Sequence, residues 1–455
     1  MSDRLLNRNF LLFWQGQLVS RLGSQIYTVA MVFWVKHTTG SASWVGVLMM
    51  LATLPVALLS PLGGVVADHY SRRRILVLTD AGAGLTMVVL GGAMLFFPKE
   101  PSLLRLAFMT ALLLGVLRAF FVPAAGATLP DLVPSQKVQQ ANSLYSFGSK
   151  LAELVGQGVG GFLYTAVGAP VMILVNGISY LFSAFSESFI VVPPPAGRND
   201  PPSDRRDMAR ESMDRQSWGE RLRLVQSDLV FGFRFITARR GLTILALMAA
   251  AINFLVAPYI VLLPFWVEDV LRAAPAWYGY VLASIGVGSL VGFLAAGALP
   301  LEGRQKSWGM ITALILMSLA IALPAFVSDR FLALVAVAGF GVTNGFFNVH
   351  LVSLIQLATP AELRGRVLGL LGSLVAALTP IGMALGGVAT DLIGGNVALI
   401  YAVCGGLAVL TSISAALVPD FRSFLALTIS ADQQPPDEPP SGELLSGEGP
   451  ASLTL

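Results

Sequence analysis

Long apolar runs, separated by short polar segments, occupy most of the chain. Most of these runs have the roughly 20 residues that an α-helix needs to cross the hydrocarbon core of a bilayer. Turn residues such as Pro98 and Gly394-Gly395 separate them. The runs cover residues 9–35, 43–67, 75–97, 102–125, 141–166, 169–192, 241–267, 276–299, 307–327, 331–358, 367–393 and 397–418. The pattern therefore predicts an all-α membrane protein with twelve transmembrane helices.

The composition supports this prediction. Hydrophobic residues make up 55% of the 455 residues and charged residues only 12%, whereas about a quarter of an average soluble domain is charged. A soluble fold cannot hide so much apolar surface, so lipid has to cover part of it. Cys404 is the single cysteine, which excludes an intramolecular disulfide and leaves a zinc cluster without thiolate ligands.

Lys and Arg are distributed unequally between the two sides of the predicted membrane. With a cytoplasmic N-terminus and twelve crossings, 21 of the 29 lie on the cytoplasmic side and five on the external side. The remaining three, Arg21, Arg118 and Lys150, lie inside spans. The positive-inside rule therefore predicts a protein of the inner (cytoplasmic) membrane with both termini in the cytoplasm. The same rule explains the net charge of +3 without a nucleic-acid partner.

A polar segment at residues 193–240 separates the first six apolar runs from the last six. It opens with three prolines and continues with mixed charges, which is typical of a flexible cytoplasmic linker. Its residues 217–238 have apolar positions at helical spacing and predict an amphipathic helix on the inner membrane surface. A linker helix that docks on the protein itself is the alternative. The predicted units are a first bundle at 1–192, the linker at 193–240, a second bundle at 241–420 and a disordered cytoplasmic tail at 421–455.

The two halves of the chain repeat each other. A shift of 226 residues places Pro134 on Pro360, and a shift of 233 places Trp44 on Trp277. Such a repeat predicts two pseudo-symmetric six-helix bundles related by an axis along the membrane normal. Substrate is then expected between the bundles near the midplane, where rocking of the two halves gives alternating access.

The loop after the second span resembles the signature of the major facilitator superfamily. Gly64 is followed by Asp68 and then by Arg72 and Arg73, although Ser71 stands where the signature has a second glycine. The resemblance implies the major facilitator fold and a cytoplasmic latch, in which Asp68 lies against the start of the eleventh span. A tight turn whose arginines only set the topology is the alternative.

The fifth span contains small residues that resemble the antiporter motif of exporters in this superfamily. Gly156, Gly160 and Gly161 allow close approach of helices, and Gln157 stands where the motif has proline. Generic close packing is the alternative. Arg118 is placed like the buried arginine of drug/proton antiporters, and several segments resemble the branch that includes macrolide and siderophore exporters.

Polar residues near mid-depth of the predicted spans are functional candidates, because a charge there costs about 2.5–3.5 kcal/mol on insertion scales. The candidates for proton coupling are Glu153, Arg118, Lys150 and Arg21. The candidates for the substrate cavity are Gln17, Gln25, Asn253, Tyr259, Asn344 and Asn348. An ion-pair network that only locks the first bundle is the alternative. We interpret Asp80, Glu187 and Asp391 as interfacial residues near helix ends.

These features predict a secondary active transporter that exports an amphipathic organic compound, such as a drug, a siderophore or a lipid-like metabolite, in exchange for protons. Its expected partners are this small molecule, protons and the lipid bilayer, and no cofactor is expected. An importer or facilitator with the same fold and a non-transporting membrane sensor are the alternatives. An enzyme is not expected, because no metal, nucleophile–base or phosphate-binding constellation is present.

Reporter fusions test the predicted topology. Fusions made after residue 205 and after residue 420 should both report a cytoplasmic location, because the loops rich in Lys and Arg stay inside. An external signal from either fusion would contradict the twelve-span topology.

Overall fold

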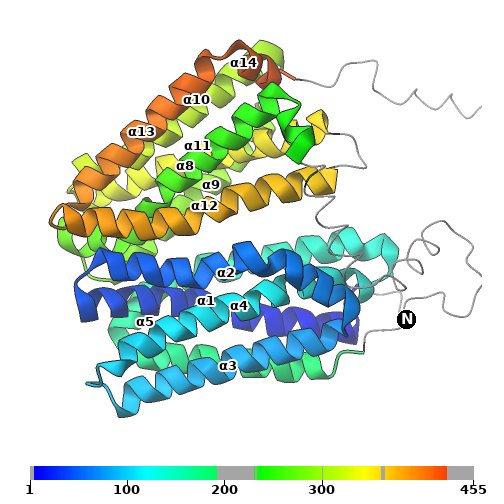
Figure 1. Cartoon of the computed structure of the whole chain (residues 1–455), viewed down its shortest axis with the longest axis vertical. Helices are drawn as coiled ribbons and strands as arrows, with labels where there is room; N and C mark the ends of the chain where they lie inside the picture. The colour runs from blue at the N-terminus through cyan, green and yellow to red at the C-terminus, as the bar shows by residue number, and fades with distance from the viewer. Residues whose placement is uncertain (1–4, 192–229, 231–232, 300, 360–363, 428–455) are drawn as a thin grey trace, which may run out of the picture.

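The computed structural model describes residues 5–191, 230, 233–299, 301–359 and 364–427, and its regular elements there are all helical (Figure 1). The first half comprises α1 (Arg8–Thr39), α2 (Ala42–His69), α3 (Arg72–Phe96), α4 (Ser102–Asp131), the 3-10 turn η1 (Ser135–Lys137) and α5 (Val138–Ser188). The second half comprises α8 (Arg240–Phe265), the π-helical turn η2 (Trp266–Val270), α9 (Ala276–Ala298), α10 (Gly303–Ala322), the 3-10 turn η3 (Leu323–Phe326), α11 (Arg330–Ala358), α12 (Arg364–Leu392), α13 (Val397–Leu417) and α14 (Pro419–Leu425).

The long helix α5 contains two of the predicted spans. Its backbone is non-helical at Gly168, where φ is 75° and ψ is 166°, a conformation that glycine adopts without strain. Its contacts with α1 show that α5 runs parallel to α1 before this break and antiparallel to α1 after it. The contacts are Trp14–Gly148 and Val29–Gly160 before the break, and Gly23–Asn176 and Gly16–Ser183 after it. The chain therefore turns back at Gly168, and the eleven long apolar helices of the described chain make twelve crossings.

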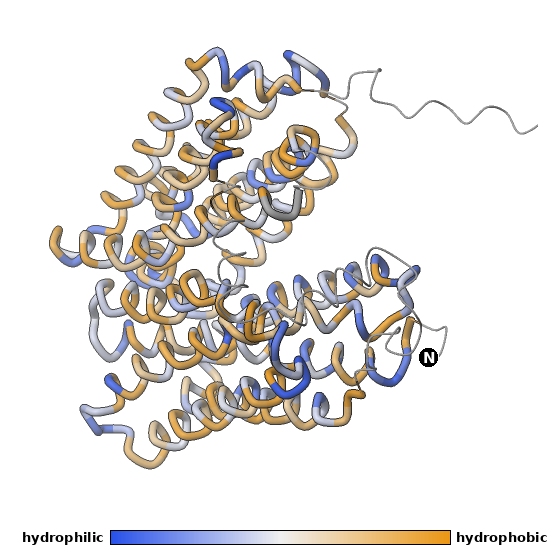
Figure 2. Tube along the Cα trace, turned by 45° about the vertical axis from the view of Figure 1, so that its right-hand side comes forward, coloured by the Kyte–Doolittle hydropathy of each residue, from blue (hydrophilic) through white to orange (hydrophobic). Residues whose placement is uncertain are grey.

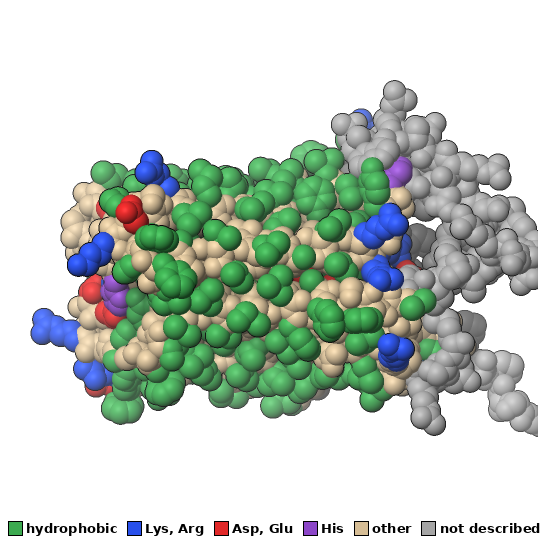
Figure 3. All heavy atoms as spheres, turned by 90° about the horizontal axis from the view of Figure 1, so that it is seen from below, with side chains coloured by type: hydrophobic (Ala, Val, Ile, Leu, Met, Phe, Trp, Pro, Cys, Tyr) green, Lys and Arg blue, Asp and Glu red, His purple; other side chains and the backbone are tan. Residues whose placement is uncertain are grey.

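The surface of the helices explains the apolar composition. Many large apolar side chains remain exposed, among them Leu78, Val89 and Leu294 at 70%, 61% and 74%. Figure 3 shows such side chains covering the middle of the molecule, with Lys and Arg toward its two ends. A soluble monomer rarely exposes an apolar patch of this extent. The protein is therefore an all-α, multi-pass membrane protein.

The structure bears on the predictions for two polar segments, the linker at 193–240 and the tail from residue 421. The predicted linker and its amphipathic helix at 217–238 lie mostly outside the described residues, but residues 233–237 are helical, and Phe235 and Ile236 are buried in the protein core. The predicted disorder from residue 421 is wrong for residues 421–427. There Phe421 and Leu425 are buried, and Lys306 Nζ donates to the Leu427 carbonyl oxygen at 3.2 Å.

The two bundles meet on one side of the membrane. They diverge toward the side on which the chain begins, called here the N-terminal side, and approach each other on the far side (Figures 1 and 2). Two pairs of helices make the far-side contact through backbone. A Cβ built on Gly279 of α9 would lie 2.0 Å from the Gly158 carbonyl oxygen of α5, and one built on Gly387 of α12 would lie 2.3 Å from the Ala42 carbonyl oxygen of α2. Only glycine permits such an approach.

Asp391, at the end of α12, caps the beginning of α2 across the two bundles. Its Oδ1 accepts from the Ala42 N–H at 3.0 Å, and its Oδ2 accepts from the Ser43 N–H at 3.0 Å and from the Ser41 hydroxyl at 2.5 Å. Unpaired N–H groups at a helix start favour a carboxylate. Asp391 thus lies near a helix end, and it also links the two bundles.

Lys36, near the end of α1, makes a second charged link on the far side. Although only 7% exposed, its Nζ lies 2.7 Å from Glu268 Oε2 and 3.0 Å from Asp269 Oδ1 in η2. His37 Nε2 also lies 3.0 Å from Glu268 Oε2. Charged hydrogen bonds therefore reinforce the far-side closure.

Substituting Asp391→Asn should favour opening of the far side. A hydrogen bond to a charged group contributes about 1.5–3 kcal/mol, so losing part of this cap should shift the equilibrium toward the open state by about tenfold. Spin labels at positions 97 and 326, in a Cys404→Ser background, should then report a longer distance by electron–electron double resonance.

Asp329→Asn is the matched control, because Asp329 caps α11 within a single bundle by accepting from the Phe331 and Leu332 N–H groups. The control should leave the distance unchanged. An unchanged distance distribution in Asp391→Asn would show that this cap does not hold the far side closed.

Candidate functional site

The first half of α5 carries a polar face directed toward the space between the bundles. Its large exposed apolar residues share the lipid-facing side, and its glycines pack on α1 and α9. The lipid-facing residues are Phe147, Leu151, Val155 and Phe162. The glycines are Gly148, Gly156 and Gly160 toward α1, and Gly158 and Gly161 toward α9. At 3.6 residues per turn, the remaining face carries Ser146, Lys150, Glu153 and Gln157. It points away from lipid, between the two neighbouring helices.

Lys150 and Glu153 form an ion pair on this face. Lys150 Nζ lies 2.7 Å from Glu153 Oε2, and the two side chains are 74% and 40% exposed. Charged groups within a membrane span face an aqueous cavity or the bundle interior rather than lipid. The structure therefore brings two of the predicted proton-coupling residues together on the face of α5 that lies between α1 and α9.

An amide pair continues the polar face toward the far side. Gln157 Nε2 donates to Gln25 Oε1 at 2.9 Å and thereby joins α5 to α1. The glycines of the antiporter-like motif make this approach possible: a Cβ on Gly156 would lie 2.6 Å from Gln25 Cβ, and one on Gly161 would lie 2.2 Å from the Pro275 carbonyl oxygen. The motif therefore packs α5 against helices of both bundles.

The other two predicted proton-coupling residues lie apart from this pair. Arg118 is exposed on the side of α4 away from its lipid-facing residues Met109 and Leu113. Arg21 stacks over the Tyr145 ring, with 4.5 Å from the guanidinium carbon to the ring centroid, and donates a hydrogen bond to the Tyr145 hydroxyl. None of the ion pairs in the described chain includes either arginine.

Two predicted cavity residues lie inside the bundles instead, and their assignment to the cavity is wrong for this conformation. Gln17 is 2% exposed and donates from Nε2 to Glu187 Oε1 at 2.9 Å. Tyr259 is 1% exposed, and its ring centroid lies 5.7 Å from that of Phe340 and 5.1 Å from that of Tyr401. Helical periodicity places residues on a common face, but it does not tell whether that face meets the cavity or the bundle interior.

The predicted polar residues of the second bundle are neutral and weakly engaged. Asn253 Nδ2 donates to the Ala249 carbonyl oxygen of its own helix at 2.9 Å. Asn344 Nδ2 lies 3.7 Å from Met317 Sδ, and Asn348 is exposed. The charges near mid-depth thus belong to the first bundle.

Sequence reasoning missed two buried carboxyl groups. Asp80 of α3 and Glu187 of α5 are 2% and 0% exposed, so the first bundle encloses both, although Glu187 lies in the last turn of α5 as expected. The depth of Asp80 was detectable, because Asp80 lies two turns inside a helix that begins at Arg72. The burial of Glu187 was not, because it depends on α1 and α3 covering the last turn of α5.

The predicted latch residues lie on the N-terminal side. Asp68 is 48% exposed and 3.9 Å from Arg72. Arg72 Nη1 donates to Asp131 Oδ2 at 2.5 Å, and Arg73 donates to the Ser188 carbonyl oxygen. A Cβ on Gly64 would meet open space. In this conformation both arginines bind within the first bundle.

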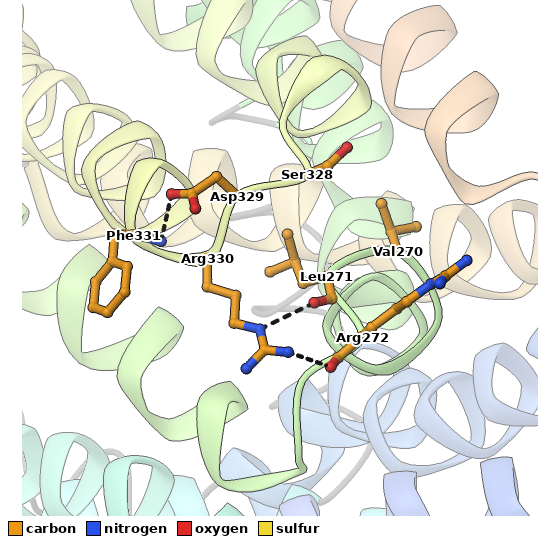
Figure 4. A pocket seen from close by; sticks show the side chains of 7 residues that line it. All are labelled: Val270, Leu271, Arg272, Ser328, Asp329, Arg330 and Phe331. Atoms are coloured by element: carbon orange, nitrogen blue, oxygen red, sulfur yellow. Dashed lines mark hydrogen bonds between the residues drawn. The ribbon is translucent and has the colours of Figure 1, made fainter.

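A separate hollow lies on the far side between η2 and α11 (Figure 4). Arg330 lines it and binds the loop after η2, donating from Nε to the Leu271 carbonyl oxygen at 3.3 Å and from Nη2 to that of Arg272 at 2.7 Å. The Arg330 guanidinium thus fastens this loop, away from the polar face of α5.

Comparison with known proteins agrees with this architecture. The chain is 25% identical to macrolide efflux protein A of Streptococcus pyogenes over 399 residues, covering 85% of this chain and 90% of that protein. It is 28% identical to the multidrug efflux pump Tap of Mycolicibacterium fortuitum over 384 residues, covering 83% and 88%. The crystal structure of the nucleoside transporter NupG shares the fold, with a TM-score of 0.66, 12% identity, and coverage of 90% of this chain and 100% of that one.

The family model described as Major Facilitator Superfamily matches residues 13–382. Together with the two bundles, this match shows that the chain is a membrane transporter and not an enzyme. It belongs to the Major Facilitator Superfamily.

Proposed function

We propose that the protein exports an amphipathic organic compound in exchange for protons. The observation that carries the proposal is the Lys150–Glu153 pair, which is exposed at mid-depth on the face of α5 between the bundles, while the far side is held closed. A compound entering from the N-terminal side would meet this pair. The similarity to efflux proteins supports export as the direction.

The N-terminal side corresponds to the cytoplasm in this proposal. Most Lys and Arg residues lie in the loops on that side of the predicted topology, as the positive-inside rule requires. In this proposal, the observed conformation is open toward the cytoplasm of a bacterial cell. Such a conformation is the one that loads substrate for export.

The chemistry of the wall suits a large amphipathic molecule, and a weakly basic one in particular. Glu153 offers a carboxylate to a protonated amine, and Gln25, Gln157 and Asn348 offer hydrogen bonds to oxygen-rich groups. A cationic substrate and a proton would compete for Glu153, and this competition provides a simple basis for exchange. We therefore propose amphipathic amines, macrolides among them, as the first substrates to test.

Everted membrane vesicles provide the direct test of function. When their lumen is acidified, vesicles that contain the protein should accumulate radiolabelled erythromycin or fluorescent ethidium, and nigericin should abolish the accumulation by collapsing the pH gradient. Vesicles without the protein are the control. Equilibration that is indifferent to the pH gradient would instead identify a facilitator, and no movement of either compound would contradict the proposed substrate class.

Substituting Glu153→Gln tests the cavity carboxylate. Gln mimics the protonated acid and cannot release a proton, so accumulation driven by the gradient should fall about tenfold or more. Weaker passive exchange of the same compound should continue through the hydrogen bonds that Gln25, Gln157 and Asn348 offer. Glu100→Gln is the control, because Glu100 lies in the exposed α3–α4 loop. Normal accumulation by Glu153→Gln would leave Glu153 as a structural partner of Lys150 only.

A further inference from the structure

A second pair of carboxyl groups lies inside the first bundle, apart from the cavity pair. Asp80 of α3 and Glu187 of α5 are almost completely buried and close enough to interact electrostatically. Asp80 Oδ2 and Glu187 Oε2 are both buried without a hydrogen-bond partner. Two acceptor oxygens left unpaired in this way are costly if both groups are ionised.

The hydrogen bonds that these carboxyl groups do make come from neutral donors. Gln17 Nε2 donates to Glu187 Oε1 at 2.9 Å, and the Ser183 hydroxyl lies near Asp80. Gln17 Nε2 also lies 3.5 Å from Ser183 Oγ, so one small network includes both acids. Neutral donors orient the carboxyl groups but do not balance two negative charges.

Arg21 is the cation that faces Asp80 of the pair. It comes from α1 and interacts electrostatically with Asp80, yet its guanidinium lies over Tyr145 and its Nε has no hydrogen-bond partner. Among the ion pairs of the described chain, none joins Arg21 to either acid. One cation facing two carboxyl groups gives a neutral cluster only when one of the acids carries a proton.

The other titratable and charged groups around the cluster do not change this balance. Tyr145 and Tyr180 of α5 are neutral phenols, and the more distant Tyr27 of α1 faces Tyr180. Arg118 of α4 acts on Tyr180. On the N-terminal side, Arg73 of α3 is occupied by the Ser188 carbonyl oxygen. The charge count therefore rests on Arg21 and the two acids.

We propose that Asp80 and Glu187 form a proton-binding site that holds one shared proton in this conformation. Two carboxyl groups at close range cannot both ionise readily, and sharing a proton removes the repulsion. The role of the pair in storing the transported proton rests on the proposed function. The binding of one proton by the pair does not depend on that function.

The geometry also gives the proton an effect on its surroundings. Gln17, Arg21 and Tyr145 line one tightly packed spot between α1 and α5, next to the buried acids. Loss of the shared proton leaves two carboxylates opposite Arg21 and draws its guanidinium away from Tyr145. Arg21 belongs to α1 and Tyr145 to α5, so the state of the buried pair acts on a contact between these two helices.

Infrared difference spectroscopy of the purified full-length protein tests the site directly. Raising the pH should remove a carboxylic-acid carbonyl band that is sensitive to D₂O. Asp80→Asn and Glu187→Gln should each abolish this band, because the single remaining acid then pairs with Arg21 and stays ionised. Glu187→Asp, which keeps both acids, should retain it. Glu153→Gln should retain it too, because Glu153 belongs to the other pair.

Several outcomes would overturn the proposal. Absence of the band from the wild type, or its persistence in both Asp80→Asn and Glu187→Gln, would show that the pair does not share a proton. Loss of the band on adding Na⁺ at constant pH would identify a metal-cation site instead. Retention of the band in Glu187→Asp would show that a change of side chain at this position does not by itself remove the band.

The vesicle assay separates the site from the proposed function. If the pair stores the coupled proton, Asp80→Asn and Glu187→Gln should lose accumulation driven by the pH gradient. Normal accumulation in both variants would overturn the coupling role. A wild-type protein that shows the titrating band but moves no compound would contradict the proposed function and leave the proton site in place.

Discussion

The carboxylate of Asp391 at the beginning of α2 is the contact on which the observed conformation depends. It joins α12 of one bundle to α2 of the other through three hydrogen bonds, where a helix N-terminus most favours a negative charge. Around it, the glycine contacts let the two bundles approach closely, but they include no charged side chain. The Asp391 cap and the Lys36–Glu268 pair stabilise the closed far side, because their hydrogen bonds have to break before that side opens.

The position of Asp391 has a counterpart on the N-terminal side. Asp68 is near the end of α2, and the family resemblance predicts that it binds the beginning of α12 when that side closes. Asp391 is near the end of α12 and binds the beginning of α2. Thus α2 carries Asp68 for closure of the N-terminal side, and α12 carries Asp391 for closure of the far side. In a rocking mechanism only one of these contacts forms at a time, and here Asp68 is exposed while Asp391 is engaged.

Most of the fold could be predicted from the sequence, because lipid imposes a strict constraint on it. Every backbone polar group in the hydrocarbon must be bonded within its own helix, so apolar runs of spanning length translate directly into helices. The sequence also predicted the break between the spans at 141–166 and 169–192, and the structure has its non-helical residue, Gly168, at this break within α5. The tail prediction failed where Phe421 finds a buried position against the second bundle, because that site exists only after the bundle has formed.

The candidate site was less predictable, for a physical reason that Gln17 and Asp80 illustrate. A helix in a bundle has a lipid face, a bundle face and a cavity face, and sequence periodicity resolves only the lipid face from the other two. Gln17 was therefore assigned to the cavity although it binds Glu187. The burial of Asp80 likewise depends on α1 and α5, which no local pattern encodes. By contrast, Lys150 and Glu153 are one turn apart, so their pairing follows from helix geometry alone.

The two carboxylate sites of the first bundle differ in what a proton can do at each. Glu153 is 40% exposed and paired with Lys150, so water screens its charge. Asp80 and Glu187 are enclosed, so a change of one charge is felt by every helix around them. The glycine contacts between the bundles are uncharged and insensitive to pH. In the proposed mechanism a proton biases the rocking of the bundles through side-chain charges. The buried pair, whose Asp80 faces Arg21 on α1, then acts on the helix that carries Lys36 to the far-side closure.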